Sequence, residues 1–85
     1  MKIIFNQDTK RLPEVAQYAD LVAQVLKVFT VDLTKELGHN LKFYYVDSDE
    51  DIISVTSQSD YEEALAQYPG NKLRLVLAQS VEEAQ

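Results

Sequence analysis

The chain has 85 residues, a net charge of -6 and no cysteine, so it fits one domain and has no disulfide, catalytic thiol or cysteine-based zinc site. The acidic balance argues against nucleic acid and anionic membranes as partners, because both need a basic surface, and it favours a basic protein surface. No apolar run reaches transmembrane length, and the run before Asn6 is too short for a signal peptide, so we expect a cytoplasmic protein.

The first elements in chain order form a hairpin. Residues 2–5 alternate in polarity and predict a strand, and residues 6–8 are rich in turn-forming side chains. Residues 9–13 return as a second strand that Pro13 should close, because proline has no amide donor. Because side chains alternate between the two faces of a strand, Leu12 is expected to point to the core. This hairpin carries three basic residues: Lys2, Lys10 and Arg11.

The period of the apolar residues then changes to that of a helix. Between Tyr18 and Phe29 they follow the i, i+3, i+4, i+7 spacing, which predicts a helix over residues 17–29 without a good N-cap residue. Residues 31–40 are a connection that can hold one turn of helix before Gly38. His39, the single histidine, lies in this connection, and we interpret it as structural.

The second half predicts two strands, a helix and a last strand. Residues 41–46 alternate as a strand, residues 47–51 form an acidic turn, and residues 52–56 form the next strand. Ser57 and Asp60 resemble a capping box at the start of a helix that runs to about residue 67. The remaining segments are a turn at 69–70, a strand over 72–77 with leucines on one face, and a tail over 79–85 that we expect to fray.

This order of elements, ββαββαβ, predicts an α+β fold in which helices cover one face of a mixed sheet. It matches the ubiquitin-like β-grasp arrangement, whose first and last strands lie side by side at the centre. The predicted domain covers residues 1–78. Tyr44 and Tyr45 are interpreted as sheet packing.

Acidic side chains crowd one stretch of the chain. From Phe43 to Asn71 there is no lysine or arginine, and half of the chain's acidic residues fall there. Like charges repel, so this crowding lowers stability unless a partner compensates. We interpret the cluster as the functional face: Asp47, Asp49, Glu50, Asp51, Asp60, Glu62 and Glu63.

The cluster and its flanks resemble a known motif. The run Tyr45-x-Asp47-x-Asp49-Glu50-Asp51, followed by Asp-Tyr-Glu-Glu-Ala over residues 60–64, is similar to the acidic OPCA motif of the Phox and Bem homology (PB-one) domain. The opening residues 2–12 are similar to that family's basic pattern, in which a strand lysine precedes a turn and a basic pair. One departure is Glu50, where the family usually has glycine.

The resemblance implies a protein-interaction module and no enzyme. In this family the acidic motif of one protomer binds the basic cluster of another, so the implied partner is a PB-one domain of the same or another protein. The implied basic face is Lys2, Lys10 and Arg11. Two modes stay open: head-to-tail homo-oligomerisation through both faces, or a heterodimer in which only the acidic face works. The family is used by signalling scaffolds and autophagy receptors.

Other functions fit the residues less well. A calcium loop starting at Asp47 would need Gly at its sixth and Glu at its twelfth position, but Ile52 and Gln58 stand there. An enzyme would need a base, a nucleophile or a metal in a pocket, and we predict no catalytic residue, metal or cofactor. A conjugated ubiquitin-like modifier would end in Gly-Gly, and a domain that binds small GTPases would lack the acidic motif.

Overall fold

The computed structural model describes residues 1–29 and 41–84. Its elements in chain order are β1 (Lys2–Phe5), β2 (Asp8–Arg11), α1 (Tyr18–Val28), β3 (Lys42–Val46), β4 (Ile52–Val55), α3 (Gln58–Gln67), β5 (Arg74–Ala78) and α4 (Val81–Ala84). The connection predicted over residues 31–40, with Gly38 and His39, lies outside the described residues.

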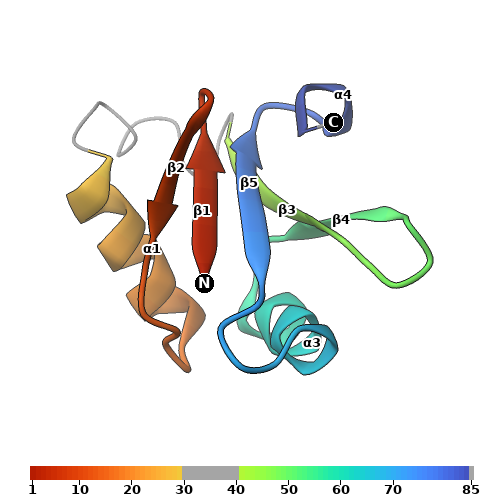
Figure 1. Ribbon diagram of the computed structural model, residues 1–85, viewed down its shortest axis with the longest axis horizontal. Coiled ribbons are helices and arrows are strands. Elements are labelled where there is room, and N and C mark those ends of the chain that lie inside the picture. Colours follow the sequence, from red (N-terminus) through yellow and green to blue (C-terminus); the bar gives the residue numbers. More distant parts are fainter. Residues whose placement is uncertain (30–40, 85) are drawn as a thin grey trace.

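The described strands form one mixed sheet in the order β2-β1-β5-β3-β4. Strand β1 pairs in parallel with β5 and antiparallel with β2, and the other neighbours are antiparallel. Figure 1 shows β1 and β5 side by side with their arrowheads at the same end. First and last strands are therefore central, and the ubiquitin-like β-grasp arrangement predicted from the element order is confirmed.

The first hairpin has a tighter loop than predicted. Phe5 pairs with Asp8, which leaves only Asn6 and Gln7 in the loop. Both loop residues have positive φ, 52° and 67°, as the two-residue turns that match the twist of a β-hairpin require. The second strand therefore begins at Asp8 and ends at Arg11, so its predicted range of residues 9–13 was wrong at both ends.

The core lies between one face of the sheet and the helices α1 and α3. Leu21 and Val25 of α1 and Tyr61 of α3 are fully buried against inward-facing residues of the sheet. The apolar period that predicted α1 therefore marks its buried face. The alternation predicted over residues 72–77 is also confirmed, since Leu73, Leu75 and Leu77 are buried, although β5 itself begins at Arg74.

The predicted tail over residues 79–85 contains the short helix α4 (Val81–Ala84). In α4 the side chain of Ser80 accepts a hydrogen bond from Glu83 N at 3.2 Å, and the Glu83 carboxylate accepts one from Gln79 N at 3.4 Å. Ser80 is thus the cap of α4, and Glu83 reaches back to the amide one residue before the cap, which is a variant of the capping box. The Ser-x-x-Glu sequence that makes it was the signal the sequence analysis missed.

Sheet parity decides which side chains face away from the helices. Lys2 and Ile4 of β1, Tyr44 of β3, and Arg74 and Val76 of β5 share this outer face through their register. Helix α4 packs against β5, and its Ala84 lines a pocket with Tyr44 and Val76. None of the helices in the described part of the chain is long and apolar enough to span a membrane.

Candidate interaction faces

The acidic turn is held together by one of its own aspartates. Asp47 Oδ1 accepts hydrogen bonds from Asp49 N at 2.9 Å and from Asp51 N at 2.8 Å. Backbone bonds from Asp47 N to Asp51 O and from Glu50 N to Asp47 O close the turn. Aspartate suits this task because its short side chain can reach amides a few residues along the chain. The carboxylates of Asp49, Glu50 and Asp51 remain exposed to solvent.

Glu50 occupies the position where a glycine was expected. Its φ is 66°, which lies in the left-handed region that costs a residue with a Cβ about 1–2 kcal/mol. The turn therefore keeps the backbone conformation that glycine allows and gains an exposed carboxylate in exchange for strain.

Some acidic side chains of α3 accept hydrogen bonds within the domain, and others do not. Ser57 caps the helix by accepting a hydrogen bond from Asp60 N at 3.2 Å, as predicted. The Asp60 carboxylate accepts bonds from the backbone and hydroxyl of Thr56, so its reciprocal partner lies one residue before the cap. Glu62 accepts a bond from Gln58 Nε2, and Glu63 is exposed.

Turn and helix enclose a small acidic hollow. It has a volume of about 230 Å³ and is lined by Tyr45, Asp47, Ile53, Asp60, Glu63 and Gln67. Gln67 ties the two sides together, because its Oε1 accepts a hydrogen bond from Ser48 N at 3.2 Å. Burial raises the pKa of Tyr45, and the carboxylates of Glu63, Asp47 and Asp60 raise it further. The hollow is thus a site of negative potential that a lysine ammonium could enter.

Three cations stand in one row on the outer face of the sheet. Lys2 pairs in register with Arg11 on one side and with Arg74 on the other, so the three side chains are cross-strand neighbours on one face. We call Arg11, Lys2 and Arg74 the basic row. Backbone bonds from Leu12 N to Met1 O and from Lys2 N to Leu73 O fix the start of β1.

The basic row borders a broad hollow. Its volume is about 690 Å³, and Lys72 joins the three cations of the row among its lining residues. The single ion pair among residues 1–29 and 41–84 joins Lys10 to Asp8. The four cations around this hollow therefore have no carboxylate partner within the part of the chain that the structure describes.

The family model for the PB1 domain, as the Phox and Bem homology domain is abbreviated, matches residues 1–80. This chain belongs to the PB1 domain family. PB1 domains mediate protein–protein interaction by pairing with other PB1 domains. A search of curated proteins found no similar sequence.

The PB1 fold separates the two charged regions. The basic row spans β2, β1 and β5, whereas the acidic turn joins β3 to β4 at the other end of the sheet. The remaining predicted acids lie on α3, which packs on the inner face. No ion pair joins the two regions within the part of the chain that the structure describes.

Lys10 lies apart from the other predicted basic residues. It alternates with Arg11 along β2 and pairs in register with the buried Ile3, so its position has the parity of the inner face. Its ammonium lies 3.5 Å from the Asp8 carboxylate. The structure brings together Lys2 and Arg11, as predicted, and adds Arg74 and Lys72, which the sequence analysis did not select.

The acidic turn also brings three carboxylates close to one another. One oxygen from each of Asp47, Asp49 and Asp51 lies within 4.8 Å of the others, a spacing that could hold a metal ion. Asp47 Oδ1 already accepts two backbone hydrogen bonds. Because the loop lacks the EF-hand positions for glycine and glutamate, we do not assign a calcium site to it.

Proposed function

We propose that this PB1 domain assembles head to tail, with the acidic turn and α3 of one copy bound to the basic row of the next. The observation that carries this proposal is the presence of two charge clusters of opposite sign that form no ion pair among residues 1–29 and 41–84. The acidic side comprises Asp47, Asp49, Glu50, Asp51, Asp60, Glu62 and Glu63, and the basic side comprises Lys2, Arg11, Lys72 and Arg74.

The geometry of the two sides determines the kind of assembly. A contact between different surfaces of two identical copies leaves one free surface at each end, so it closes into a ring or continues as a filament. As a polymer the domain would present many copies of any attached binding site, which raises avidity. Such an assembly suits a cytoplasmic scaffold in signalling or autophagy, and we include that setting in the proposal.

Charge pairing can supply the required affinity. Close ion pairs across interfaces couple with about 1.5–7 kcal/mol, and Lys2 at the centre of the row has a charged neighbour on each side. Repulsion within the row is relieved when carboxylates bind it. Because exposed charges are screened over about 8 Å at physiological salt, the assembly should weaken as ionic strength rises.

A second mode is a heterodimer in which only the acidic side works. The net charge of -6 favours it, since acidic residues outnumber basic ones by 14 to 8 and copies of the same chain repel one another at long range. The partner would then be another PB1 domain with a basic cluster.

Sedimentation velocity across a concentration series distinguishes the two modes. We expect wild type to form larger species at low salt, to dissociate at high salt, and to stay monomeric when Lys2→Ala removes the centre of the basic row. Lys42→Ala is the matched control, because Lys42 is exposed on β3 outside the row. A wild type that stays monomeric throughout would rule out self-assembly and direct attention to a basic partner.

A further inference from the structure

The outer face of the sheet carries a pocket that the pairing of two PB1 domains does not explain. It has a volume of about 300 Å³, which is at the lower end of the range for ligand pockets, and lies over β3, β5 and the start of β4. Its lining residues are Tyr44, Tyr45, Val46, Ile52, Tyr68, Lys72, Arg74, Val76 and Ala84. We call it the outer pocket.

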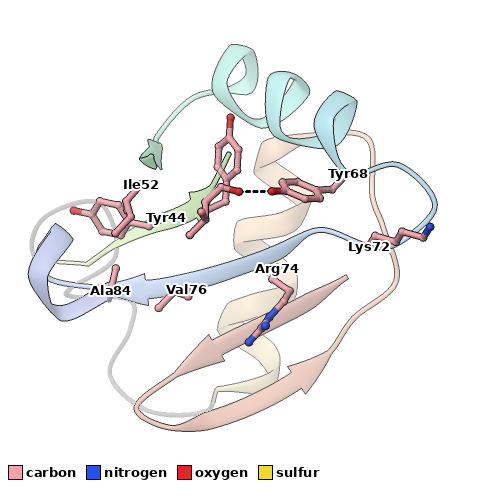
Figure 2. A pocket seen from close by; sticks show the side chains of 9 residues that line it. Tyr44, Ile52, Tyr68, Lys72, Arg74, Val76 and Ala84 are labelled. Carbon is pink, nitrogen blue, oxygen red and sulfur yellow. Dashed lines mark hydrogen bonds between the residues drawn. The ribbon is translucent and has the colours of Figure 1, made fainter. Parts of the chain in front are cut away.

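The outer pocket has an apolar end and a cationic end. Figure 2 shows Tyr44, Ile52 and Val76 toward α4, and Arg74 and Lys72 toward the loop that precedes β5. Val46, also in the lining, is 51% exposed, so its apolar side chain is accessible to a ligand. Within the described residues the two cations form no ion pair.

The walls of the pocket are fixed in place. The Tyr68 hydroxyl donates a hydrogen bond to the Val46 carbonyl, which joins the end of α3 to the end of β3 (Figure 2). On the other side Ala84 belongs to the short helix α4, which packs on β5. Tyr44, at the apolar end of the pocket, is itself buried. A ligand would therefore enter a site whose shape exists before binding, which reduces the entropic cost of binding.

The distance between the apolar and the cationic end of the pocket matches the spacing of alternate side chains in an extended peptide. Arg74 and Val76 are two residues apart on the same face of β5, a separation of about 6.6 Å along a strand. Lys72 lies in the turn just before β5 and lines the same pocket. A bound extended chain repeats its side chains with the strand period, so an apolar side chain over Val76 would place an acidic side chain two residues away near Arg74. The next acidic side chain would point toward the turn that carries Lys72.

We propose that the outer pocket binds an extended acidic peptide of a partner protein, with one apolar side chain inserted between Tyr44, Val46 and Val76. Carboxylates at alternate positions of the peptide pair with Arg74 and Lys72. This site goes beyond PB1 pairing, because a bare acidic surface makes no use of the apolar end. Since Arg74 also belongs to the basic row, such a peptide and a second copy of the domain compete for it.

The test uses a variant that keeps the outer face intact and does not self-assemble through its acidic turn. Asp49→Ala with Asp51→Ala serves, because both side chains are exposed and lie at the end of the sheet away from the basic row. The ¹⁵N-labelled protein is titrated with the acetylated amide of Leu-Ser-Asp-Ser-Asp. The control peptide has Ala in place of Leu, and octanoate is a third probe.

We expect the leucine peptide to shift the amide resonances of Tyr44, Val46 and Val76 in a saturable manner. Val46→Glu or Lys72→Glu should each weaken binding by about tenfold or more, while Lys42→Glu, outside the pocket, should change it less than about twofold. Val46 and Lys72 are exposed, so both variants should fold, which their spectra would show directly.

Three results would overturn the proposal. Equal binding of the alanine peptide would mean that charge alone is recognised. Shifts confined to Lys2 and Arg11 would place the peptide on the basic row, outside the pocket. Saturable binding of octanoate with no binding of the peptide would make the occupant a small amphipathic acid. Because the assay uses a variant that lacks the Asp49 and Asp51 carboxylates of the acidic turn, its outcome does not depend on whether the wild-type domain assembles head to tail.

Discussion

The side chain of Gln58 caps a helix that begins forty residues earlier, by accepting a hydrogen bond from Tyr18 N at 2.6 Å. Its amide also donates to the Ala16 carbonyl at 3.1 Å. Helix α1 has no side-chain cap of its own, since Gln17 makes no capping bond. The first residue of α3 therefore satisfies a backbone donor of α1 and fixes how the two helices meet beneath the sheet.

Removal of this cap should destabilise the domain. We expect Gln58→Ala to lower the free energy of unfolding by about 1–2 kcal/mol, because the Tyr18 amide and the Ala16 carbonyl lose their partners. Urea unfolding followed by circular dichroism measures the change. Ser59→Ala, at the next position of α3, is the control and should stay within about 0.5 kcal/mol of wild type. Equal effects of the two substitutions would contradict the capping role.

The start of α1 is an example of a feature that local sequence patterns do not predict. Alternation and helical period depend on burial of neighbouring side chains, so they predicted the sheet face of Leu73 and Leu75 and the buried stripe of α1. The cap at Tyr18 comes from Gln58, a contact between distant segments that no local pattern contains. Helix α4 was also not predicted. The apolar pattern of a helix is absent there, and its short Ser-x-x-Glu signal was not recognised.

The candidate site residues also divide into those that a local pattern predicts and those that only contacts between distant segments bring together. The acidic turn is contiguous in sequence and was predicted as a unit. The basic row is assembled across strands, and Arg74 comes beside Lys2 only through the parallel pairing of β1 with β5. That pairing was itself predicted by the β-grasp order, so Arg74 could have been selected by following the register. Lys10 was grouped with Arg11 because the resemblance to the family implies a basic pair after the turn, and the register of β2 places the two residues on opposite sides of the strand.

This arrangement predicts how the cations rank in self-association. If the domain assembles head to tail, Arg74→Ala should weaken the association as much as Arg11→Ala does, because both flank Lys2 in the basic row. Lys10→Ala should have little effect, as its charge lies beside Asp8 on the other side of β2. Sedimentation equilibrium at low salt measures the association constants. A loss with Lys10→Ala as large as that with Arg74→Ala would refute the assignment of the row.

Alkaline pH should destabilise the domain through its buried tyrosines. Burial raises the pKa of Tyr61, and the Glu14 carboxylate raises it further. A folded-state pKa above that of the unfolded chain means that the unfolded chain loses its proton first. The stabilising contribution is therefore complete below about pH 10 and is lost as pH rises through the folded-state pKa. Burial likewise raises the pKa of Tyr18.

The substitution Tyr61→Phe isolates this contribution. At neutral pH it should lower stability by about 1 kcal/mol, because the Val15 carbonyl loses the hydrogen bond that the Tyr61 hydroxyl donates. Above about pH 10 the difference from wild type should shrink, since phenylalanine cannot ionise. Urea unfolding of both proteins at several pH values provides the comparison. The contribution of Tyr18 to the pH dependence is common to both proteins, because both contain it. A difference that does not vary with pH would contradict the linkage.

The strain at Glu50 can be tested separately from its charge. Glu50→Gly should raise the free energy of unfolding by about 0.5–1 kcal/mol, because glycine adopts the φ of 66° without steric cost. Glu50→Gln removes the charge and keeps the Cβ, so it reports only the relief of repulsion among the acids. Thermal unfolding of the three proteins at high salt distinguishes the two effects. If glutamine stabilises as much as glycine there, the backbone at this position is not strained.

Mixing two variants, each with one charged face removed, tests directly whether the acidic face of one copy binds the basic face of another. Lys2→Ala keeps the acidic turn, and the double variant Asp49→Ala with Asp51→Ala keeps the basic row. Each variant should be monomeric alone, because every contact needs one face of each kind. Mixed in equal amounts they should form a dimer that grows no further, since each partner offers only one working face. Analytical ultracentrifugation resolves these species. A mixture that stays monomeric would favour the heterodimer with another basic PB1 domain, and growth of either variant alone would mean that the contact does not use these faces.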